Sequence, residues 1–194
     1  FHRMIQTIDG LLPDTDYEIM LVRANEASET VTFHTEPEPI TLNVRDFGAF
    51  GDGVHDDTSA IQAAILCCPK NARVLIPKGT YPVTALFLKS DMILELQENA
   101  VLAGIYDRAR TPILPGQIEY DNEDGYYNLG SWEGNPIDSF ASMITGIHVK
   151  NVTICGKGVL DGRADFENWW SRPKDKIRAW RPRMIFLNHC ENIT

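Results

Sequence analysis

The fold is decided by the stretch Met143-Ile144-Thr145-Gly146-Ile147-His148-Val149-Lys150-Asn151-Val152-Thr153-Ile154-Cys155-Gly156-Lys157-Gly158-Val159-Leu160-Asp161-Gly162. It holds short β-branched runs at 147–149, 152–154 and 159–160, separated by Asn151 and by Gly156 and Gly158. Gaps this short admit neither a helix nor a wide loop, so the runs indicate brief strands joined by tight turns. Such strands cannot each have their own core. We therefore expect a solenoid whose coils bury their apolar edges against one another.

Two fragments of this stretch recur elsewhere in the chain. Val101-Leu102-Ala103-Gly104 matches 159–162, and Cys190-Glu191-Asn192-Ile193-Thr194 matches 149–153 with apolar, Asn and Thr positions in the same order. Because the spacings differ, we expect coils with loops of variable length. The recurring asparagine predicts a left-handed turn or an asparagine ladder at one corner. An ordinary β-sandwich with chance similarity is the alternative.

Composition limits the function. The chain has 194 residues with 43% hydrophobic and 23% charged content, which is typical of a soluble globular protein. A net charge of −9 argues against a general binder of nucleic acid or anionic membranes, but an anionic substrate can still be drawn into a basic cleft. No apolar run approaches the ~20 residues of a membrane span. Residues 1–20 carry no signal peptide pattern, and since one could have been removed, secreted, periplasmic and cytoplasmic locations all stay open.

No metal or cofactor is predicted. The cysteines, Cys67, Cys68, Cys155 and Cys190, form no Cys-x-x-Cys pair. Cys155 and Cys190 fall on strand-like positions, which favours buried small hydrophobes over a disulfide. The histidines are scattered, and the acidic cluster at 119–124 lacks the spacing of an EF-hand.

The first 36 residues are predicted to end a β-sandwich. Tyr17, Ile19 and Leu21 alternate, and a second strand-like run follows at 30–35. The segment resembles the last strands of a fibronectin type III domain, with Tyr17 in place of its tyrosine corner. Such a module needs ~100 residues, so we expect these residues to be only its last part. Residues 37–42 then form a Pro/Glu-rich, stiff linker, and 43–194 form the next domain.

A capping helix is predicted to begin near 57–59. Ser59 with Gln62 fits a capping box, and an apolar face would cover the open end of the solenoid. That face consists of Ile61, Ala64, Ile65 and Cys68. Asp56 and Asp57 are adjacent and so diverge at a helix start, where acidic groups favour the macrodipole, and we interpret them as caps rather than a catalytic pair.

Two long excursions interrupt the short apolar runs. Residues 105–138 are rich in Asp, Glu, Gly, Pro and aromatics, and we expect a long structureless loop of the kind that is often functional. Residues 163–182 carry Trp169, Trp170 and Trp180. Within 172–183 stand six basic residues and the single acid Asp175. Solenoid loops tend to project from one face, often the binding face.

These motifs resemble a known family. Residues 46–65 look like the amino-terminal cap of the pectate-lyase-like right-handed parallel β-helix superfamily. The ordered set that follows is similar to the polygalacturonase family, glycoside hydrolase family 28: 131–136 (Ser-Trp-Glu-Gly-Asn-Pro), 142–146 (Ser-Met-Ile-Thr-Gly), 156–162 (Gly-Lys-Gly-Val-Leu-Asp-Gly), Trp169-Trp170, and 181–194. A fibronectin-type module in front of the β-helix, together with an insertion before the second group of coils, is similar to the bacterial exo-acting members. The resemblance implies an all-β fold: the cap and first coils of a right-handed parallel β-helix over 43–194.

The resemblance also implies an activity. Family members hydrolyse α-1,4-galacturonosyl linkages in pectin with inversion, using aspartates as general acid and to activate water. The family signatures Asn-Thr-Asp, Gly-Asp-Asp, Gly-His-Gly and Arg-Ile-Lys are absent; 146–148 is Gly-Ile-His and 176–178 is Lys-Ile-Arg. The catalytic coils are expected downstream of Thr194. No residue here is therefore assigned as catalytic, and these 194 residues alone are predicted to be inactive.

Substrate contact is what this part of the chain could supply. Trp132 and Glu133 are candidates for a wall of the sugar groove, since an indole stacks on pyranose rings and a carboxylate accepts from hydroxyls. Trp132 could equally anchor its own loop. Arg181 and Arg183, in the basic run, could draw in polygalacturonate, the expected partner, although a solvated loop pinned by Trp169 and Trp170 is the simpler interpretation. Oligomeric state stays open.

Two other functions compete. A pectate lyase on the same scaffold would need calcium-binding aspartates and an arginine base. A non-catalytic binding or structural β-helix, such as a tailspike-type protein, could carry the same cap. The Trp-Glu-Gly and Trp-Trp motifs argue against the second.

Overall fold

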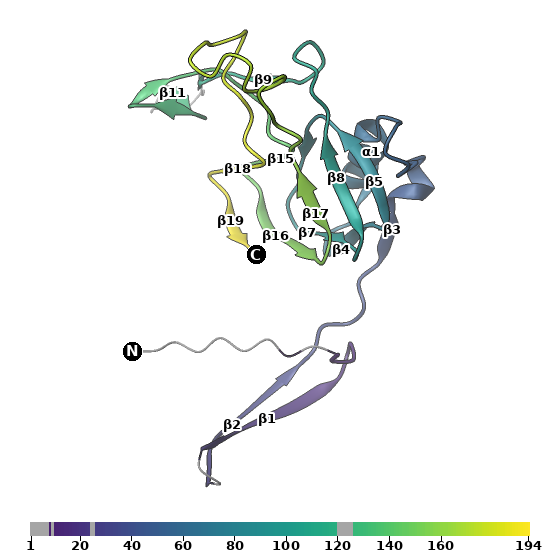
Figure 1. Cartoon of the computed structure of the whole chain (residues 1–194). Helices are drawn as coiled ribbons and strands as arrows, with labels where there is room; N and C mark the ends of the chain where they lie inside the picture. Colours follow the sequence, from purple (N-terminus) through teal and green to yellow (C-terminus); the bar gives the residue numbers. More distant parts are fainter. Residues whose placement is uncertain (1–7, 9, 24–25, 120–125) are drawn as a thin grey trace. The chain divides into compact units, whose positions relative to one another are not determined.

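The computed structural model describes residues 8, 10–23, 26–119 and 126–194. The chain divides into two compact units, Phe1–Pro39 and Ile40–Thr194, each described here by itself. In the first unit β1 (Asp16–Arg23) and β2 (Glu26–His34) form an antiparallel hairpin (Figure 1). Tyr17 stacks on Phe33 with ring centroids 5.8 Å apart, and its hydroxyl accepts the Leu12 N–H at 2.7 Å. A hydroxyl bound to backbone upstream is the geometry of a tyrosine corner.

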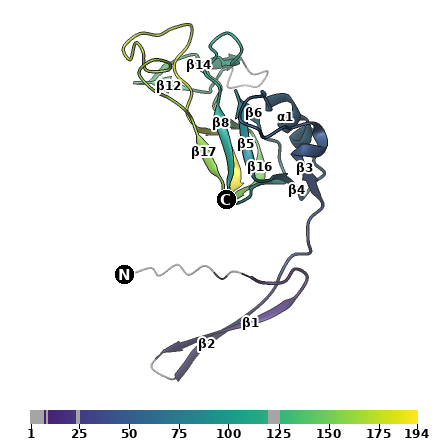
Figure 2. The ribbon, with the colours of Figure 1, turned by 45° about the vertical axis from the view of Figure 1, so that its right-hand side comes forward.

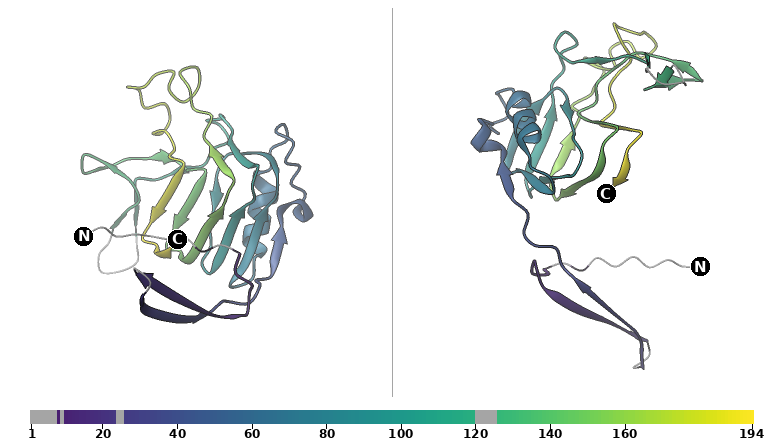
Figure 3. Two further views of the ribbon diagram at one scale, coloured as in Figure 1. Left: turned by 60° about the horizontal axis from the view of Figure 1, so that its bottom comes forward. Right: turned by 180° about the vertical axis from the view of Figure 1, so that it is seen from behind.

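The second unit is a stack of parallel coils, which confirms the predicted all-β solenoid. Its main sheet holds β3 (Thr41–Asn43), β4 (Ala72–Ile76), β7 (Met92–Leu96), β16 (Lys150–Gly156) and β19 (Glu191–Ile193). A second sheet holds β5 (Gly79–Val83), β8 (Ala100–Gly104) and β17 (Val159–Asp161), side by side in Figure 2. A third holds β6 (Leu86–Phe87), β15 (Ile144–Ile147) and β18 (Ile185–Asn188). Strands follow sequence order within each sheet and run in one direction (Figure 3).

The stretch 143–162 supplies one turn of this stack, in β15, β16 and β17. The sequence repeats lie one coil apart, because Val159 pairs with Val101 and Lys150 with Glu191. Gly156 has φ 107, and a Cβ there would lie 1.9 Å from the Leu96 carbonyl oxygen, so only glycine fits. The strand predicted at 147–149 is misplaced, because β15 spans Ile144–Ile147 and the chain turns at His148, which has φ 54.

A polar residue in the left-handed conformation stands at the start of successive strands of the main sheet, either just before the strand or at its second residue. Asn71, Asp91, Asn151 and Asn192 have φ values of 59, 59, 54 and 53. The Asn151 amide Nδ2 donates to Oδ1 of Asp91 at 2.7 Å. Both predicted features of this corner, the left-handed turn and the ladder, are therefore confirmed, with Asp91 standing in one rung.

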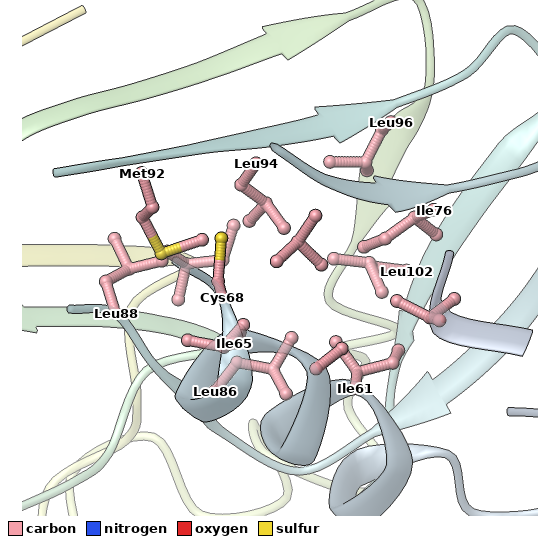
Figure 4. Packing of buried hydrophobic residues seen from close by; sticks show 14 of the residues in the cluster. Ile61, Ile65, Cys68, Ile76, Leu86, Leu88, Met92, Leu94, Leu96 and Leu102 are labelled. Atoms are coloured by element: carbon pink, nitrogen blue, oxygen red, sulfur yellow. The ribbon is translucent and has the colours of Figure 1, made fainter. Parts of the chain in front are cut away.

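Helix α1 (Thr58–Cys67) lies at the end of the stack away from β18 and β19 (Figure 1). Its predicted apolar face is confirmed, because Ile61, Ala64, Ile65 and Cys68 are all buried. Ile65 and Ile61 point into the coil interior toward side chains such as Leu94 and Leu102 (Figure 4). A short 3-10 helix, η1 (Val44–Phe47), precedes it. No helix within the described residues is long and apolar enough to cross a membrane.

The predicted capping scheme at the start of α1 is wrong in part. Asp57 occupies the cap position, but its side chain does not bond to the helix, because the buried carboxylate accepts the Phe50 N–H at 2.6 Å and the Gly51 N–H at 3.0 Å. Asp56 does accept the Thr58 N–H at 2.9 Å. Gln62 makes no capping box, since its amide bonds to both the N–H and the carbonyl of Phe87. These side chains serve tertiary contacts that sequence periodicity does not reveal.

The excursion 105–138 is not structureless, contrary to the prediction. It contains β9 (Ile113–Leu114), β10 (Gln117–Glu119), β11 (Tyr126–Asn128), β12 (Ser131–Trp132) and β13 (Asn135–Pro136), and β14 (Ser139–Phe140) follows. These strands pair antiparallel as β9–β14, β10–β11 and β12–β13. The pairing satisfies backbone groups that a long loop would otherwise leave without partners.

The cysteines carry no disulfide among the described residues. Cys190 is half-buried, and its thiol lies 3.4 Å from the Gly146 carbonyl oxygen. Cys155 is exposed, so its predicted burial is wrong. Side chains alternate along a strand, and because Val152 is buried on β16, Cys155 falls on the outward face.

Candidate functional site: an aromatic-arginine pocket

Both excursions leave the stack at the same corner. The first runs from the end of β8 to β15 and the second from β17 to β18. Because β8 pairs with β17 and β15 pairs with β18, the two excursions begin and end one coil apart. In the preceding coil, only 84–85 separate β5 from β6. Two insertions at one corner of adjacent coils, about 4.8 Å apart, must lie side by side, as Figures 1 and 3 show.

Arg108 locks the second excursion to the first. Its guanidinium carbon lies 4.7 Å from the Trp169 ring centroid and 5.5 Å from that of Phe140. Its nitrogens donate to the carbonyls of Trp169 and Ile177, each at 3.3 Å. Trp169 is 5% exposed, which confirms the prediction that it pins its loop. Cation–π contacts of this kind strengthen when shielded from water.

Trp180 ties the excursions together at a second place. Its carbonyl accepts the Phe140 N–H at 2.8 Å, and its N–H donates to the Asp138 carbonyl at 2.9 Å. Its ring stacks on Trp132, with centroids 5.9 Å apart and planes at 14°. Arg181 lies against the next tryptophan along the wall, with its guanidinium carbon 4.2 Å from the Trp170 centroid and 5.7 Å from that of Trp180.

These residues border a pocket of about 320 Å³ between the excursions. We name it the aromatic-arginine pocket, and its walls include Trp132, Trp170, Trp180, Arg181, Pro182 and Arg183. The volume lies in the range of small-ligand pockets. A smaller pocket of about 100 Å³ shares Trp170 and 181–183 and is otherwise lined by groups such as Met143, Gly162 and Met184. Stacked indoles beside cations suit a ligand that has an apolar ring face and negative charge.

The structure brings together three of the four residues predicted to contact substrate. Trp132, Arg181 and Arg183 line the pocket. Glu133 does not line it, and lies exposed with φ 51 at the turn of the β12–β13 hairpin. Trp132 is 59% exposed even though it stacks on Trp180.

Two pocket residues were missed as candidate contacts. Trp170 was predicted only to pin its loop, but it is 43% exposed and lines the pocket. Trp180 had no predicted role. Its position between Ala179 and Arg181 in a cationic run was the available signal, because exposed indoles beside arginines are common at recognition sites.

The described residues offer no metal centre. Within 26–119 and 126–194, and in the described part of the first unit, no three His, Cys, Asp or Glu side chains are grouped to hold an ion. The charge near the pocket is instead cationic, from the run 172–183.

Fold and pocket together define a class: a parallel β-helix whose corner insertions form an aromatic, cationic pocket. Residues 41–157 match the family described as rhamnogalacturonase A/epimerase, pectate lyase-like. The chain is 35% identical over 184 residues to an exo-poly-alpha-D-galacturonosidase of Dickeya chrysanthemi, covering 90% of this chain and 29% of that protein. It is similar to the family 28 exopolygalacturonase structure of Yersinia enterocolitica, with 29% identity, a TM-score of 0.75, and coverage of 96% of this chain and 40% of that one.

The chain therefore belongs to the pectate-lyase-like rhamnogalacturonase A/epimerase family, and its resemblance to the polygalacturonases is confirmed. It spans less than half the length of either relative. A shorter similarity also exists to the plasmin and fibronectin-binding protein A of Streptococcus pneumoniae, 48% identical over 75 residues, or 36% of this chain and 10% of that protein.

Proposed function

We propose that this chain is the amino-terminal portion of a pectin-degrading glycoside hydrolase that cleaves α-1,4-galacturonosyl linkages with inversion, from the end of the polymer. The observation that carries the proposal is the similarity to the Dickeya chrysanthemi enzyme, which extends over 90% of the chain and so includes the first excursion. Function resides in such sites rather than in the fold, which many activities share.

The aromatic-arginine pocket suits a uronate. The stacked tryptophans present flat faces to a pyranose ring, and the arginines complement its carboxylate. In this proposal Trp132, Arg181 and Arg183 line the sugar-binding site within the pocket. Glu133 accepts from hydroxyls of a sugar residue that extends past Trp132. The β12–β13 hairpin then forms a wall at one end of the groove, which favours terminal cleavage.

The catalytic aspartates are expected beyond Thr194, so residues 1–194 alone should not hydrolyse polygalacturonate. The proposal is tested with the full-length protein on polygalacturonate. Release of monomer or dimer, with inverted anomeric configuration by NMR, is the expected result. Products of many lengths would refute terminal cleavage. Unsaturated products that absorb in the ultraviolet, with activity lost in a chelator, would assign a pectate lyase instead.

A non-catalytic binding protein is the second candidate. It is favoured by the similarity to the plasmin and fibronectin-binding protein A of Streptococcus pneumoniae, which is 48% identical over 36% of the chain. Binding of the full-length protein to pectin with no bond cleavage would support this candidate and overturn the hydrolase.

We also propose that the first unit closes a fibronectin type III-like sandwich. The Tyr17 hydroxyl bond to the Leu12 N–H supports this, and an isolated two-stranded hairpin is only marginally stable. A structure of the full-length protein should show a second sheet packed on Phe33. A bare hairpin there would contradict the proposal.

A further inference from the structure

The two pocket arginines are held in different ways. The Arg181 guanidinium is stacked, 4.2 Å from the Trp170 centroid and 5.7 Å from that of Trp180. Its Nη2 also donates to the Pro173 carbonyl at 3.0 Å. The bond to Pro173 commits one of the five N–H donors, and together with the stacking it holds the guanidinium in the orientation that stiffens the indoles on which it lies.

Arg183 is anchored only through its backbone. Its N–H donates to the Ser142 hydroxyl at 3.1 Å. Arg183 lies two residues before the start of β18 at Ile185. Its side chain is exposed, and its nearest ring is Phe186, whose centroid is 6.0 Å away. Across the described residues its guanidinium forms no ion pair and donates no hydrogen bond. The whole donor fork therefore remains for a ligand in the pocket that it lines.

A carboxylate is what separates a uronate from its ester or from a neutral hexose. The indole faces bind the ring of all three alike, because stacking does not depend on the charge at the ring substituent. A free guanidinium pairs with a carboxylate through two parallel N–H bonds and cannot do so with an ester. We expect this discrimination from Arg183, because its side chain is exposed and, among the described residues, its donor fork is wholly uncommitted.

We propose that Arg183 selects the carboxylate of a uronate in the aromatic-arginine pocket, and that Arg181 is a positioning residue that holds Trp170 and Trp180. This inference rests on the proposed function, in which the pocket takes a sugar. It assigns charge specificity to one side chain and ring recognition to the others. The two arginines, two residues apart in the sequence, thus have different roles: Arg183 recognises the carboxylate and Arg181 positions the indoles.

The test uses the full-length protein with galacturonate and its 6-methyl ester, monosaccharides that contain no linkage to hydrolyse. Tryptophan fluorescence titrations report binding beside the indoles. Wild type should prefer galacturonate over the ester by about tenfold or more, as expected for a charge-assisted pair. Arg183→Gln should remove this preference and leave ester affinity unchanged. Arg183→Lys, which keeps the charge but not the fork, should retain part of it.

Arg181→Gln should weaken both sugars by a similar factor and alter the fluorescence of the unliganded protein. Lys174→Gln removes an exposed charge of the same run that does not line the pocket, and should leave the preference unchanged. The inference is overturned if Arg183→Gln keeps the preference for galacturonate over the ester, or if only Arg181→Gln loses it. In either case, binding of the sugars by the wild type still supports the sugar site. Wild type that binds neither sugar overturns the proposed pocket function itself.

Discussion

Asn192 donates from its amide Nδ2 to Oδ1 of Asn151, 2.9 Å away on the neighbouring coil. Asn151 in turn donates to Asp91, so the ladder runs across consecutive strands of the main sheet. Backbone bonds alone would tolerate a slip between coils, but a slip of one residue would break every rung and turn the buried side chains outward. The ladder therefore fixes the register on which the alignment of the two excursions depends.

Substituting Asn151 should destabilise the second unit in two separable ways. Asn151→Ala loses both side-chain bonds and puts alanine, which disfavours the left-handed conformation, in place of asparagine, which tolerates it, at a combined cost of about 2 kcal/mol in unfolding free energy. Asn151→Gly also loses the bonds but accepts φ 54 without strain, so it should cost about 1 kcal/mol less than the alanine variant. Urea unfolding measures both, and equal losses would show that the left-handed conformation carries no strain.

The repeat unit was predictable because its signals are local. Short β-branched runs, the glycines at 156 and 158, and asparagine at one corner all act within a few residues, and their pairing follows from the solenoid. The roles of Asp57 and Gln62 were not predictable, because their partners, Phe50, Gly51 and Phe87, are set by packing between coils. A capping pattern and a tertiary clamp use the same residue types.

The pocket was predictable only in part. The sequence marks Trp132, Arg181 and Arg183 by composition, but not that Trp180 stacks on Trp132 across 48 residues, from 132 to 180. That contact depends on two insertions of unequal length leaving adjacent coils at one corner. Trp169 and Trp170 are neighbours in sequence, yet one is buried under Arg108 and the other lines the pocket. Sequence position alone does not separate these roles.

Asp52 should contribute to acid stability. Backbone N–H bonds from His55 and Val54, and the His55 ring, lower the pKa of Asp52 to about 2 from its ordinary 3.8. A carboxyl whose folded pKa is depressed adds stability above its unfolded value, and this is lost as pH falls from 3.8 through about 2. NMR titration of the Asp52 carboxyl should give a midpoint near 2, whereas one near 3.8 would contradict the loop geometry.

His34 should have the opposite effect in the first unit. Its ring nitrogens lie 2.8 Å from Asp16 and 3.0 Å from Asp14, and these bonds raise the pKa of His34 above 6.5. A histidine with a raised folded pKa adds stability that is complete below 6.5 and disappears as pH rises through the folded pKa. The His34 ring should titrate above 6.5 by NMR, and Asp16→Asn should lower that midpoint more than Asp14→Asn. Unchanged midpoints in both variants would show that the carboxylates do not act on the ring.

Arg108→Met should free the second excursion. The variant loses cation–π contacts, worth about 0.5–2 kcal/mol each, and both bonds to the Trp169 and Ile177 carbonyls. Trypsin should then cut faster within 172–183, where the basic side chains are mostly exposed. Arg110→Met is the matched control, since Arg110 forms an ion pair with Asp56 rather than contacts with the second excursion. Equal cleavage rates for the two variants would mean that Arg108 does not hold the loop.

Substituting Trp132 distinguishes its two possible roles, contact with the sugar and anchoring of its own loop. If it stacks on the sugar, Trp132→Ala should weaken galacturonate binding by about 1 kcal/mol in calorimetry and barely change urea unfolding, because the side chain is 59% exposed. Trp132→Phe should keep most of the affinity. Glu133→Gln should have a smaller effect, since Glu133 lies at the hairpin turn outside the pocket lining. If Trp132→Ala instead lowers stability and leaves the affinity intact, the indole only packs against Trp180, and the proposal that Trp132 forms a wall of the sugar groove is wrong.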